Sequence, residues 1–441
     1  MRDYFILAII LLSAPAALFS PYYGVLVWSW IAYFNPHRYG WGIAHNAPVA
    51  LMIAVPTLIG TIFARRNNHV VTRESVLLLM LWMWLALTTY YIRSVPLFTG
   101  HAQDATVHLE NISKIFLMTI ASILLVSSRE KLRVLVLVIL GSFGLRALFA
   151  TLFFIKTGGQ YIVWGPEGSF LEDNNDFALG LNMTIPMFFY MARAESQRWV
   201  RMTLRFLMVC VIASIVGTYS RGGLVGLTVV ALAIVAKSRR KIQGMLLVGI
   251  AVTVIATVTT AQWKNRMDTF ALGTLDDSAE ARLAIWRGGW NLVKDYPLTG
   301  GGLDVYTDPS AFSQYIPAGA VPESGLHGAH SIYFQMLGEQ GLVGLGLFLA
   351  LLGTCYMTAR KLGKAARRSP QVEWARPYSD MFQVTLLAYM SNGATLGRAY
   401  FDFFYQVVAC VIILKILVQR DRRSLAAVGD DVVSEVELVA T

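Results

Sequence analysis

The sequence predicts an all-α protein that crosses a membrane many times, and three features support this fold class. Of the 441 residues, 56% are hydrophobic and only 15% are charged, whereas a soluble globular chain is about a quarter charged. Apolar stretches of about 20 residues, long enough to cross a bilayer as a helix, recur along the chain. Basic residues gather in the connections between them, as in the cytoplasmic loops of membrane proteins. We therefore expect about 12 transmembrane helices and a large, partly helical external loop.

The first apolar segment, residues 4–35, leaves its number of crossings open. It consists of two short apolar runs broken at Pro21. Together they are long for one span and short for two, since a span needs about 30 Å of helix at 1.5 Å per residue. The segment lacks a cleavable signal pattern and is interpreted as an anchor. The other predicted spans are residues 48–64, 74–94, 112–128, 133–156, 176–194, 202–218, 222–237, 243–260, 331–357, 378–395 and 400–419.

Clusters of basic residues lie in every second connection between the predicted spans, and they indicate the orientation of the chain. The positive-inside rule assigns all of them to the cytoplasm, so the remaining connections face the periplasm. The net charge of +10 therefore reports topology, and we expect no nucleic acid partner. The clusters are Arg65–Arg66, Arg129 with Lys131 and Arg133, Arg198 to Arg205, Lys237 to Lys241, Arg360 to Arg368, and Arg420 to Arg423.

Four regions follow from this pattern. Residues 1–260 are predicted to form the N-terminal transmembrane helices, and residues 261–330 the periplasmic loop. Residues 331–423 are predicted to form the C-terminal transmembrane helices. The acidic segment 424–441 is predicted to be a disordered cytoplasmic tail.

The predicted periplasmic loop contains a signal for a helix. Asp277 followed by Glu280 resembles a capping box, so we expect a helix near residues 279–294. Arg282 falls on the same helical face as a tryptophan, which favours a buried partner for its guanidinium, such as an anion. For Arg287, a solvated surface position is the simpler interpretation.

Arg221, in the string TYSRGG at residues 218–223, breaks the positive-inside pattern because it is a cation on the predicted outer side. One interpretation is a side chain that snorkels to lipid headgroups. The other is an anion site, since flanking glycines let the backbone approach a ligand and a guanidinium suits phosphate. The glycines favour the second.

A polar stripe opens the predicted span at residues 331–357. Ser331, Gln335 and Glu339 are spaced by four residues and follow His330, so they share one helical face. A neutral imidazole at that boundary can act as a general base for a hydroxyl. The alternative, a structural histidine bonded at a helix start, is favoured modestly by the residues alone. His327 is a weaker candidate of the same kind.

Other polar groups stand at or inside predicted spans. Arg146 and Lys114 lie within apolar runs, and Arg146 needs either an acidic partner or a ligand-filled cavity. Five polar residues crowd the start of the predicted span at 176–194, where capping explains one of them and sugar recognition would explain several. These five are Glu172, Asp173, Asn174, Asn175 and Asp176.

Several functional classes lack their motifs in this sequence. The string TGGGLD lacks the lysine of a phosphate-binding loop. HExxH and Cys/His metal arrays are absent, and the three cysteines lie in apolar runs as packing residues. We therefore expect neither a metal nor a cofactor. The string GLVGLG at residues 341–346 is interpreted as close helix packing through small residues.

Five strings together resemble the O-antigen ligase and O-antigen polymerase superfamily, and most closely its exosortase-associated O-glycosylation ligase branch. They occur in the family's order along nearly the whole chain. One departure is Gln340, where histidine is expected in that branch, and we assign it no catalytic role. The strings are FNPHRYGWG (34–42), GSFLEDNNDFAL (168–179), TYSRGG (218–223), ARLAIWRGGWNLVKDYPLTGGG (281–302) and AHSIYFQMLGEQGLVGL (329–345).

The resemblance implies a GT-C-like membrane glycosyltransferase of the bacterial inner membrane that is metal-independent and inverting. Its implied donor is a glycan on undecaprenyl diphosphate, and its implied acceptor is a hydroxyl of the lipid A core. Carried onto this sequence, Arg221 and Arg282 bind the diphosphate and His330 is the catalytic base. The further candidates for substrate binding are Arg146, Glu172, Asn175, Arg287, His327 and Gln335.

Three alternatives remain at the level of the sequence. An O-antigen polymerase would use a second lipid-linked repeat as acceptor, and a protein O-glycosylation ligase would use a protein. A transporter of lipid-linked glycans would place its charges at the membrane midplane and show repeated halves. Only Arg146 favours a transporter, since the other polar groups gather at the predicted periplasmic edge.

Overall fold

The computed structural model describes residues 2–439 except residues 41, 65–69, 239, 247, 251–252, 254–274, 318, 320–325 and 327. In this described part every regular element is a helix, which confirms the all-α prediction. Six of these helices are long and apolar enough to cross a membrane, including α5, α6, α7 and α9. The others among them are α14 and the first part of α16. The count of about 12 spans stays a prediction.

The N-terminal segment forms two helices, α1 (Arg2–Phe19) and α2 (Pro21–Phe34). Pro21 is the first residue of α2, a position where its missing N–H costs nothing. Both helices pack against α4 (Val49–Phe63). The contact is close, since a Cβ on Gly60 would lie 2.3 Å from the carbonyl oxygen of Leu18. The short helices η1 (Pro36–Tyr39) and α3 (Ile43–Asn46) connect α2 to α4.

The next helices begin and end close to their predicted limits, with one exception. α6 begins ten residues before the predicted start at residue 112, because its first turns carry His108 and other polar residues that lower the hydropathy of that stretch. In chain order the elements are α5 (Arg73–Tyr91), η2 (Ile92–Ser94), η3 (Pro96–Phe98), α6 (Ala102–Leu125), α7 (Arg129–Lys156), α8 (Asn174–Ala194), α9 (Arg198–Gly217) and α10 (Arg221–Lys237). The predicted span at 243–260 lies mostly outside the described residues.

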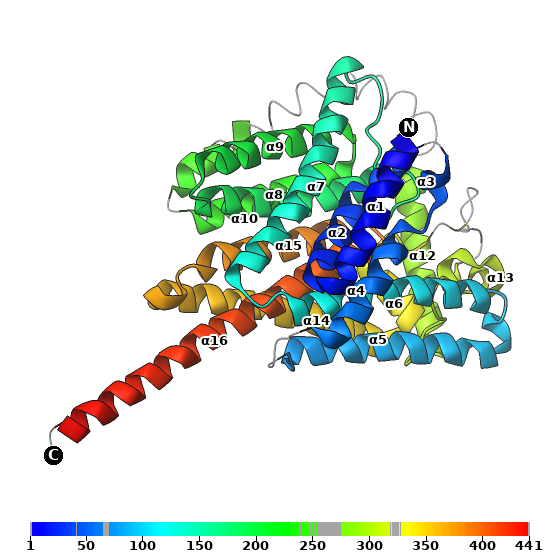
Figure 1. The fold of residues 1–441 in the computed structure, drawn as a ribbon. Helices are drawn as coiled ribbons and strands as arrows, with labels where there is room; N and C mark the ends of the chain where they lie inside the picture. Colours follow the sequence, from blue (N-terminus) through cyan, green and yellow to red (C-terminus); the bar gives the residue numbers. More distant parts are fainter. Residues whose placement is uncertain are drawn as a thin grey trace.

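The predicted external loop contains α12 (Leu275–Asp295), η4 (Val305–Thr307), α13 (Pro309–Phe312) and η5 (Ser313–Tyr315). The predicted helix is present, but it begins at Leu275, so Asp277 lies inside the helix and the capping-box prediction is wrong. In Figure 1, α12 and α13 lie at one end of the helical bundle, and the end of α16 leaves the bundle on the opposite side.

The C-terminal part contains α14 (Ile332–Arg368), η6 (Pro370–Val372), α15 (Ala375–Gly393) and α16 (Asp402–Val439). α15 packs against α8, α10 and α14, at the centre of the bundle. The sequence predicted disorder from Ser424, whereas α16 continues to Val439. That stretch contains no proline to end the helix.

α14 is kinked at Gly341, which has φ 66° and ψ −168°. The kink frees carbonyl groups of α14, and the glycine-rich turn after α12 pairs with them: Gly301 N–H donates to Gly338 O at 2.8 Å and Gly302 N–H to Glu339 O at 2.9 Å. Gly341 is therefore a backbone break, and the prediction of simple small-residue packing is wrong at this position. A Cβ there would lie 2.2 Å from the Leu298 carbonyl oxygen.

Gly341→Ala is expected to lower the stability of the fold. The substitution forces an L-residue into a conformation that glycine alone tolerates, at a cost of about 1–3 kcal/mol before the contact with Leu298 is counted. The measurement is thermal unfolding of the purified protein in detergent. Gly346→Ala on the same helix is the control, because a Cβ there meets nothing within 4 Å. Equal unfolding midpoints for both variants would contradict this account of the kink.

Candidate active site

A polar cavity of about 390 Å³ lies where α6, α8, α12 and α14 meet the connection between α15 and α16. Residues from distant parts of the sequence line it, and most of them are charged or hydrogen-bonding. The lining residues are His108, Asp173, Asn175, Asp176, Arg282, Asp304, Tyr306, Thr307, Gly328, Ala329, His330, Gln335, Glu339, Leu396, Gly397 and Arg398.

Trp286 joins α12 to the segment that precedes α14. Its indole N–H donates to the carbonyl of Ala329 at 2.7 Å, and its ring stacks on Phe334 with centroids 4.7 Å apart. Arg282 lies one helical turn before Trp286, and His330 follows Ala329 directly. This contact therefore explains why Arg282 and His330 line the same cavity.

His330 adopts a left-handed backbone conformation with φ 46°. Such a conformation is uncommon outside glycine and occurs at functional sites, where the surrounding structure holds it. The neighbouring connection approaches closely, since a Cβ on Gly397 would lie 3.2 Å from His330 N. Its own backbone conformation and the close approach of Gly397 thus both restrict the position of His330.

The polar stripe on α14 faces the connection between α15 and α16. Gln335 Oε1 accepts from the N–H of Ala399 at 3.0 Å, and Glu339 Oε2 accepts from the hydroxyl of Tyr400 at 2.7 Å. Both α14 side chains are buried. Because buried polar groups need partners, these bonds hold the connection against α14 and place Arg398 in the cavity.

Two pairs of side chains complete the lining, one an ion pair and the other a histidine–carboxylate contact. Arg398 donates to the carboxylate of Asp176 on α8, and His108 Nδ1 on α6 lies 2.9 Å from Asp304 Oδ1. The cavity therefore contains both carboxylates and cationic side chains, an arrangement suited to a ligand with an anionic group and hydroxyls.

A buried tyrosine supports this geometry from below the cavity. Tyr306 donates from its hydroxyl to the carbonyl of Phe334 at 2.6 Å. Burial, with Glu339 nearby, raises the pKa of Tyr306 well above its usual value, so the phenol stays a donor at neutral pH. The side chain of Tyr306 lies between Gly289 of α12 and Gly338 of α14. A Cβ on either glycine would lie 2.2 Å from the Tyr306 hydroxyl oxygen, so neither position has room for a side chain.

Two segments of the chain match known protein families. Residues 206–349 match the O-antigen ligase family. This match places residues 206–349 in the O-antigen ligase and O-antigen polymerase superfamily. Residues 1–196 match a family of unknown function, DUF5935. No curated protein matches the chain.

The part that matches the O-antigen ligase family contains all three residues that the sequence pointed to most strongly, Arg221, Arg282 and His330. The superfamily consists of glycosyltransferase-like membrane ligases and polymerases, which agrees with the membrane-spanning helices found here. The relation to the exosortase-associated branch stays a prediction.

The structure brings some of the predicted O-antigen ligase site residues together and leaves others apart. Arg282, His330, Asn175 and Gln335 line the cavity.

Other predicted site residues lie elsewhere. Arg287 is exposed on α12 and is not among the residues that line the cavity. Glu172 is exposed and accepts from Gly168 N–H at 2.8 Å. His327 lies outside the described residues. Arg146 lies over the ring of Tyr39, 5.0 Å from its centroid, and donates to its hydroxyl.

Arg221 lies beside the cavity at the start of α10, with its side chain exposed. Ser220 donates from its hydroxyl to Asn175 Oδ1, a cavity residue, at 2.7 Å. On the other side, a Cβ on Gly222 would lie 3.3 Å from Thr395 Oγ1, in the connection that carries Arg398. The neighbours of Arg221 thus contact two segments of the cavity wall, whereas Arg221 itself is not among the residues that line the cavity.

The cluster of polar residues before α8 divides between the two roles considered for it. Asp173 is the N-cap of α8 and accepts from the N–H of Asn175 at 2.8 Å, a capping bond. Asn175 and Asp176 line the cavity as well. Within the described ranges, the structure has no group of three or more metal-ligand side chains.

Sequence reasoning missed Arg398, His108 and Asp304. Arg398 carries the signal that identified Arg221, since it is a single cation in a connection predicted to face the periplasm. His108 and Asp304 have no such signal in the sequence, because they are far apart in the chain and only the fold brings them together.

Trp286→Phe is expected to loosen the segment around His330 while keeping the aromatic stacking. The loss of one hydrogen bond to a buried carbonyl costs about 1–3 kcal/mol. Hydrogen–deuterium exchange should therefore rise at residues 328–334. Trp290→Phe is the control, because Trp290 is exposed on the same helix. Unchanged exchange in Trp286→Phe would contradict the role assigned to this contact.

Proposed function

We propose that the chain is an O-antigen ligase-type enzyme that moves a glycan from undecaprenyl diphosphate to an acceptor hydroxyl, with the lipid A core as acceptor. The observation that carries the proposal is the meeting of Arg282 and His330 in one polar cavity, with Arg221 beside it. All three residues lie in the segment that matches the O-antigen ligase family.

The proposed location is the bacterial inner membrane, with the cavity facing the periplasm. Two features support this orientation. Basic residues from four of the predicted clusters, Arg129, Lys237, Lys361 and Arg422, line other hollows and not this cavity, which agrees with the positive-inside rule for cytoplasmic loops. The cavity lies at the end of α14 that carries Gln335 and Glu339, whereas Arg367 and Arg368 end the same helix.

In the proposed reaction, the acceptor oxygen forms a bond to the anomeric carbon of the glycan as the bond from that carbon to the lipid diphosphate breaks. Attack from the face opposite the diphosphate inverts the anomeric centre. Negative charge develops on the leaving diphosphate. Arg282 and Arg221 would stabilise this charge without a metal ion, at about 3–4 kcal/mol each if fixed donors at other active sites are a guide.

His330 would accept the proton of the acceptor hydroxyl as the new bond forms, a contribution of roughly 10²–10⁴-fold to the rate. Its strained backbone and close neighbours support a fixed position for the imidazole. Asp176, Asn175 and Gln335 line the same cavity, and their carboxylate and amide groups would form hydrogen bonds with sugar hydroxyls.

His330→Ala is expected to reduce glycan transfer at least 100-fold, since the acceptor loses its general base. The measurement is transfer from purified undecaprenyl-diphosphate glycan to lipid A core by the protein in vesicles. Arg282→Ala should reduce transfer by a similar factor through weaker stabilisation of the diphosphate. Arg287→Ala, on the exposed face of the same helix, is the control and should transfer normally. Wild-type transfer by His330→Ala would contradict the mechanism.

The acceptor can be tested in the same vesicles. The proposal predicts that glycan appears on added lipid A core and that undecaprenyl-linked glycans keep their length. Longer glycans on undecaprenyl, with none on the core, would show a polymerase with the same chemistry instead.

A further inference from the structure

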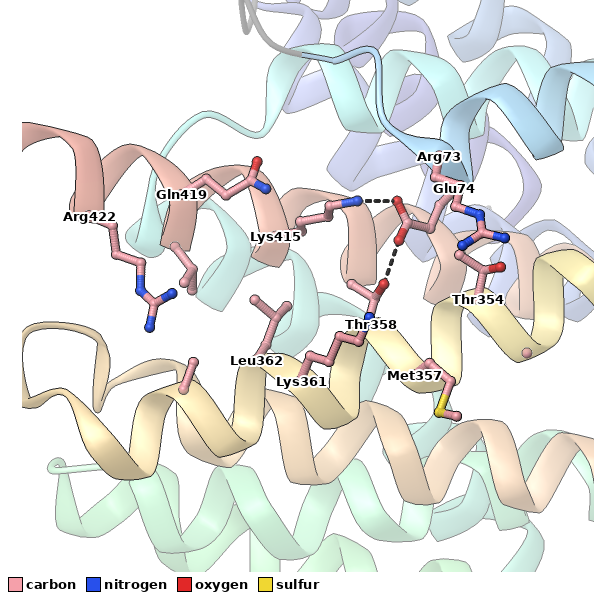
Figure 2. Close-up of a pocket in the computed structure, with 13 residues that line it drawn as sticks. Arg73, Glu74, Thr354, Met357, Thr358, Lys361, Leu362, Lys415, Gln419 and Arg422 are labelled. Carbon is pink, nitrogen blue, oxygen red and sulfur yellow. Dashed lines mark hydrogen bonds and ion pairs between the residues drawn. The ribbon is translucent and has the colours of Figure 1, made fainter.

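A second hollow lies between the other ends of α14 and α16, beside the start of α5. Its volume is about 550 Å³. Its first lining residue on α14, Gly353, lies about 18 Å beyond the kink at Gly341, at a helical rise of about 1.5 Å per residue, and it shares no lining residue with the candidate active site. Figure 2 shows side chains of the three helices directed into this space.

The hollow carries an excess of positive charge. Arg73, Lys361, Lys415 and Arg422 line it, together with a single carboxylate, Glu74. Glu74 is 1% exposed and accepts from Lys415 Nζ at 2.7 Å, and the hydroxyl of Thr358 donates to its other oxygen. One cation is thereby neutralised, and three positive charges remain.

The three remaining cations are exposed, and within the part of the chain that the structure describes no ion pair engages them. Arg73 begins α5, Lys361 projects from α14, and Arg422 projects from α16. They come from three different helices and line one hollow. In Figure 2, Arg73 and Arg422 lie at its opposite ends and Lys361 lies between them. Like charges held together repel, so an anion between them would relieve the repulsion and be held strongly.

Apolar side chains form the rest of the lining. Met357 is 51% exposed, and Leu362, Ala365 and Val418 lie beside it. Both α14 and the first part of α16 are candidate membrane spans. The apolar part of α16 is 89% buried inside the protein, so α14, with the exposed Met357, is the helix beside this hollow that offers an apolar surface to lipid tails. A free phosphate would use only the cationic part of this lining.

We propose that this hollow binds an anionic phospholipid, with its phosphate between Lys361, Arg422 and Arg73 and the upper part of an acyl chain along Met357 and Leu362. The buried Glu74–Lys415 pair holds α5 to α16, and the Thr358 hydroxyl, which donates to Glu74, holds α14 to them. The basic ends of these helices face the cytoplasm by the positive-inside rule, where anionic lipids attract clustered basic side chains.

The test is a titration of the purified full-length protein in detergent, with bound lipid counted by native mass spectrometry. The probes are phosphatidylglycerol, phosphatidylcholine with the same acyl chains, and inorganic phosphate. The wild type should retain phosphatidylglycerol in preference to phosphatidylcholine, and inorganic phosphate should not displace it. In the double variant Lys361→Gln/Arg422→Gln, affinity for phosphatidylglycerol should fall about 25-fold, at roughly fivefold for each cation.

A matched control distinguishes a built site from general basic charge. Arg193 and Arg376 line a different basic hollow, beside Asp380, so Arg193→Gln/Arg376→Gln removes the same charge elsewhere. That variant should bind phosphatidylglycerol within about twofold of wild type. An equal loss in both double variants, or wild-type affinity in Lys361→Gln/Arg422→Gln, would overturn the proposal. Displacement by inorganic phosphate at similar concentrations would show an anion site and overturn the lipid assignment.

A second measurement needs no substitution and so does not depend on folding of a variant. Phosphatidylglycerol with a photoreactive group near the start of its acyl chain, added to wild-type protein in vesicles, should label the peptide that contains Met357 and Leu362. Labelling confined to other peptides would equally overturn the proposal.

Discussion

The hydrogen bond from the Trp286 indole to the Ala329 carbonyl is the contact on which the candidate active site depends. It joins a helix of the external segment to the residues that lead into a membrane-spanning helix. A tryptophan suits this position because its large ring stacks on Phe334 while its single donor reaches a buried acceptor. The guanidinium of Arg282 and the imidazole of His330 are brought to one cavity because both residues lie within one turn of this contact.

The backbone of α14 provides the second constraint. Its kink at Gly341 would leave carbonyl groups unpaired inside the protein, a costly state, and the N–H groups of Gly301 and Gly302 satisfy two of them. The predicted external segment is thus bonded to α14 at both ends of the first section of that helix. This arrangement explains how that segment can hold the candidate site residues at fixed positions.

The sequence was sufficient for the helices and for part of the site. Apolar runs located most helices because burial in lipid demands about 20 apolar residues. The anomalous cation Arg221 follows Ser220, which bonds to the cavity residue Asn175. The start of α6 and the kink at Gly341 were missed, since polar residues and backbone strain depend on partners from elsewhere in the fold. The pairing of His108 with Asp304 shows the same limit, because no local pattern connects residues so far apart.

The central claim is that one cavity holds the diphosphate and the reacting hydroxyl together. Electron cryomicroscopy of the protein with a bound undecaprenyl-diphosphate glycan tests it most directly. We predict density for the diphosphate between Arg282 and Arg221, with the anomeric carbon facing His330. Density for the diphosphate anywhere else, such as between Lys361 and Arg422 at the opposite end of α14, would contradict the account.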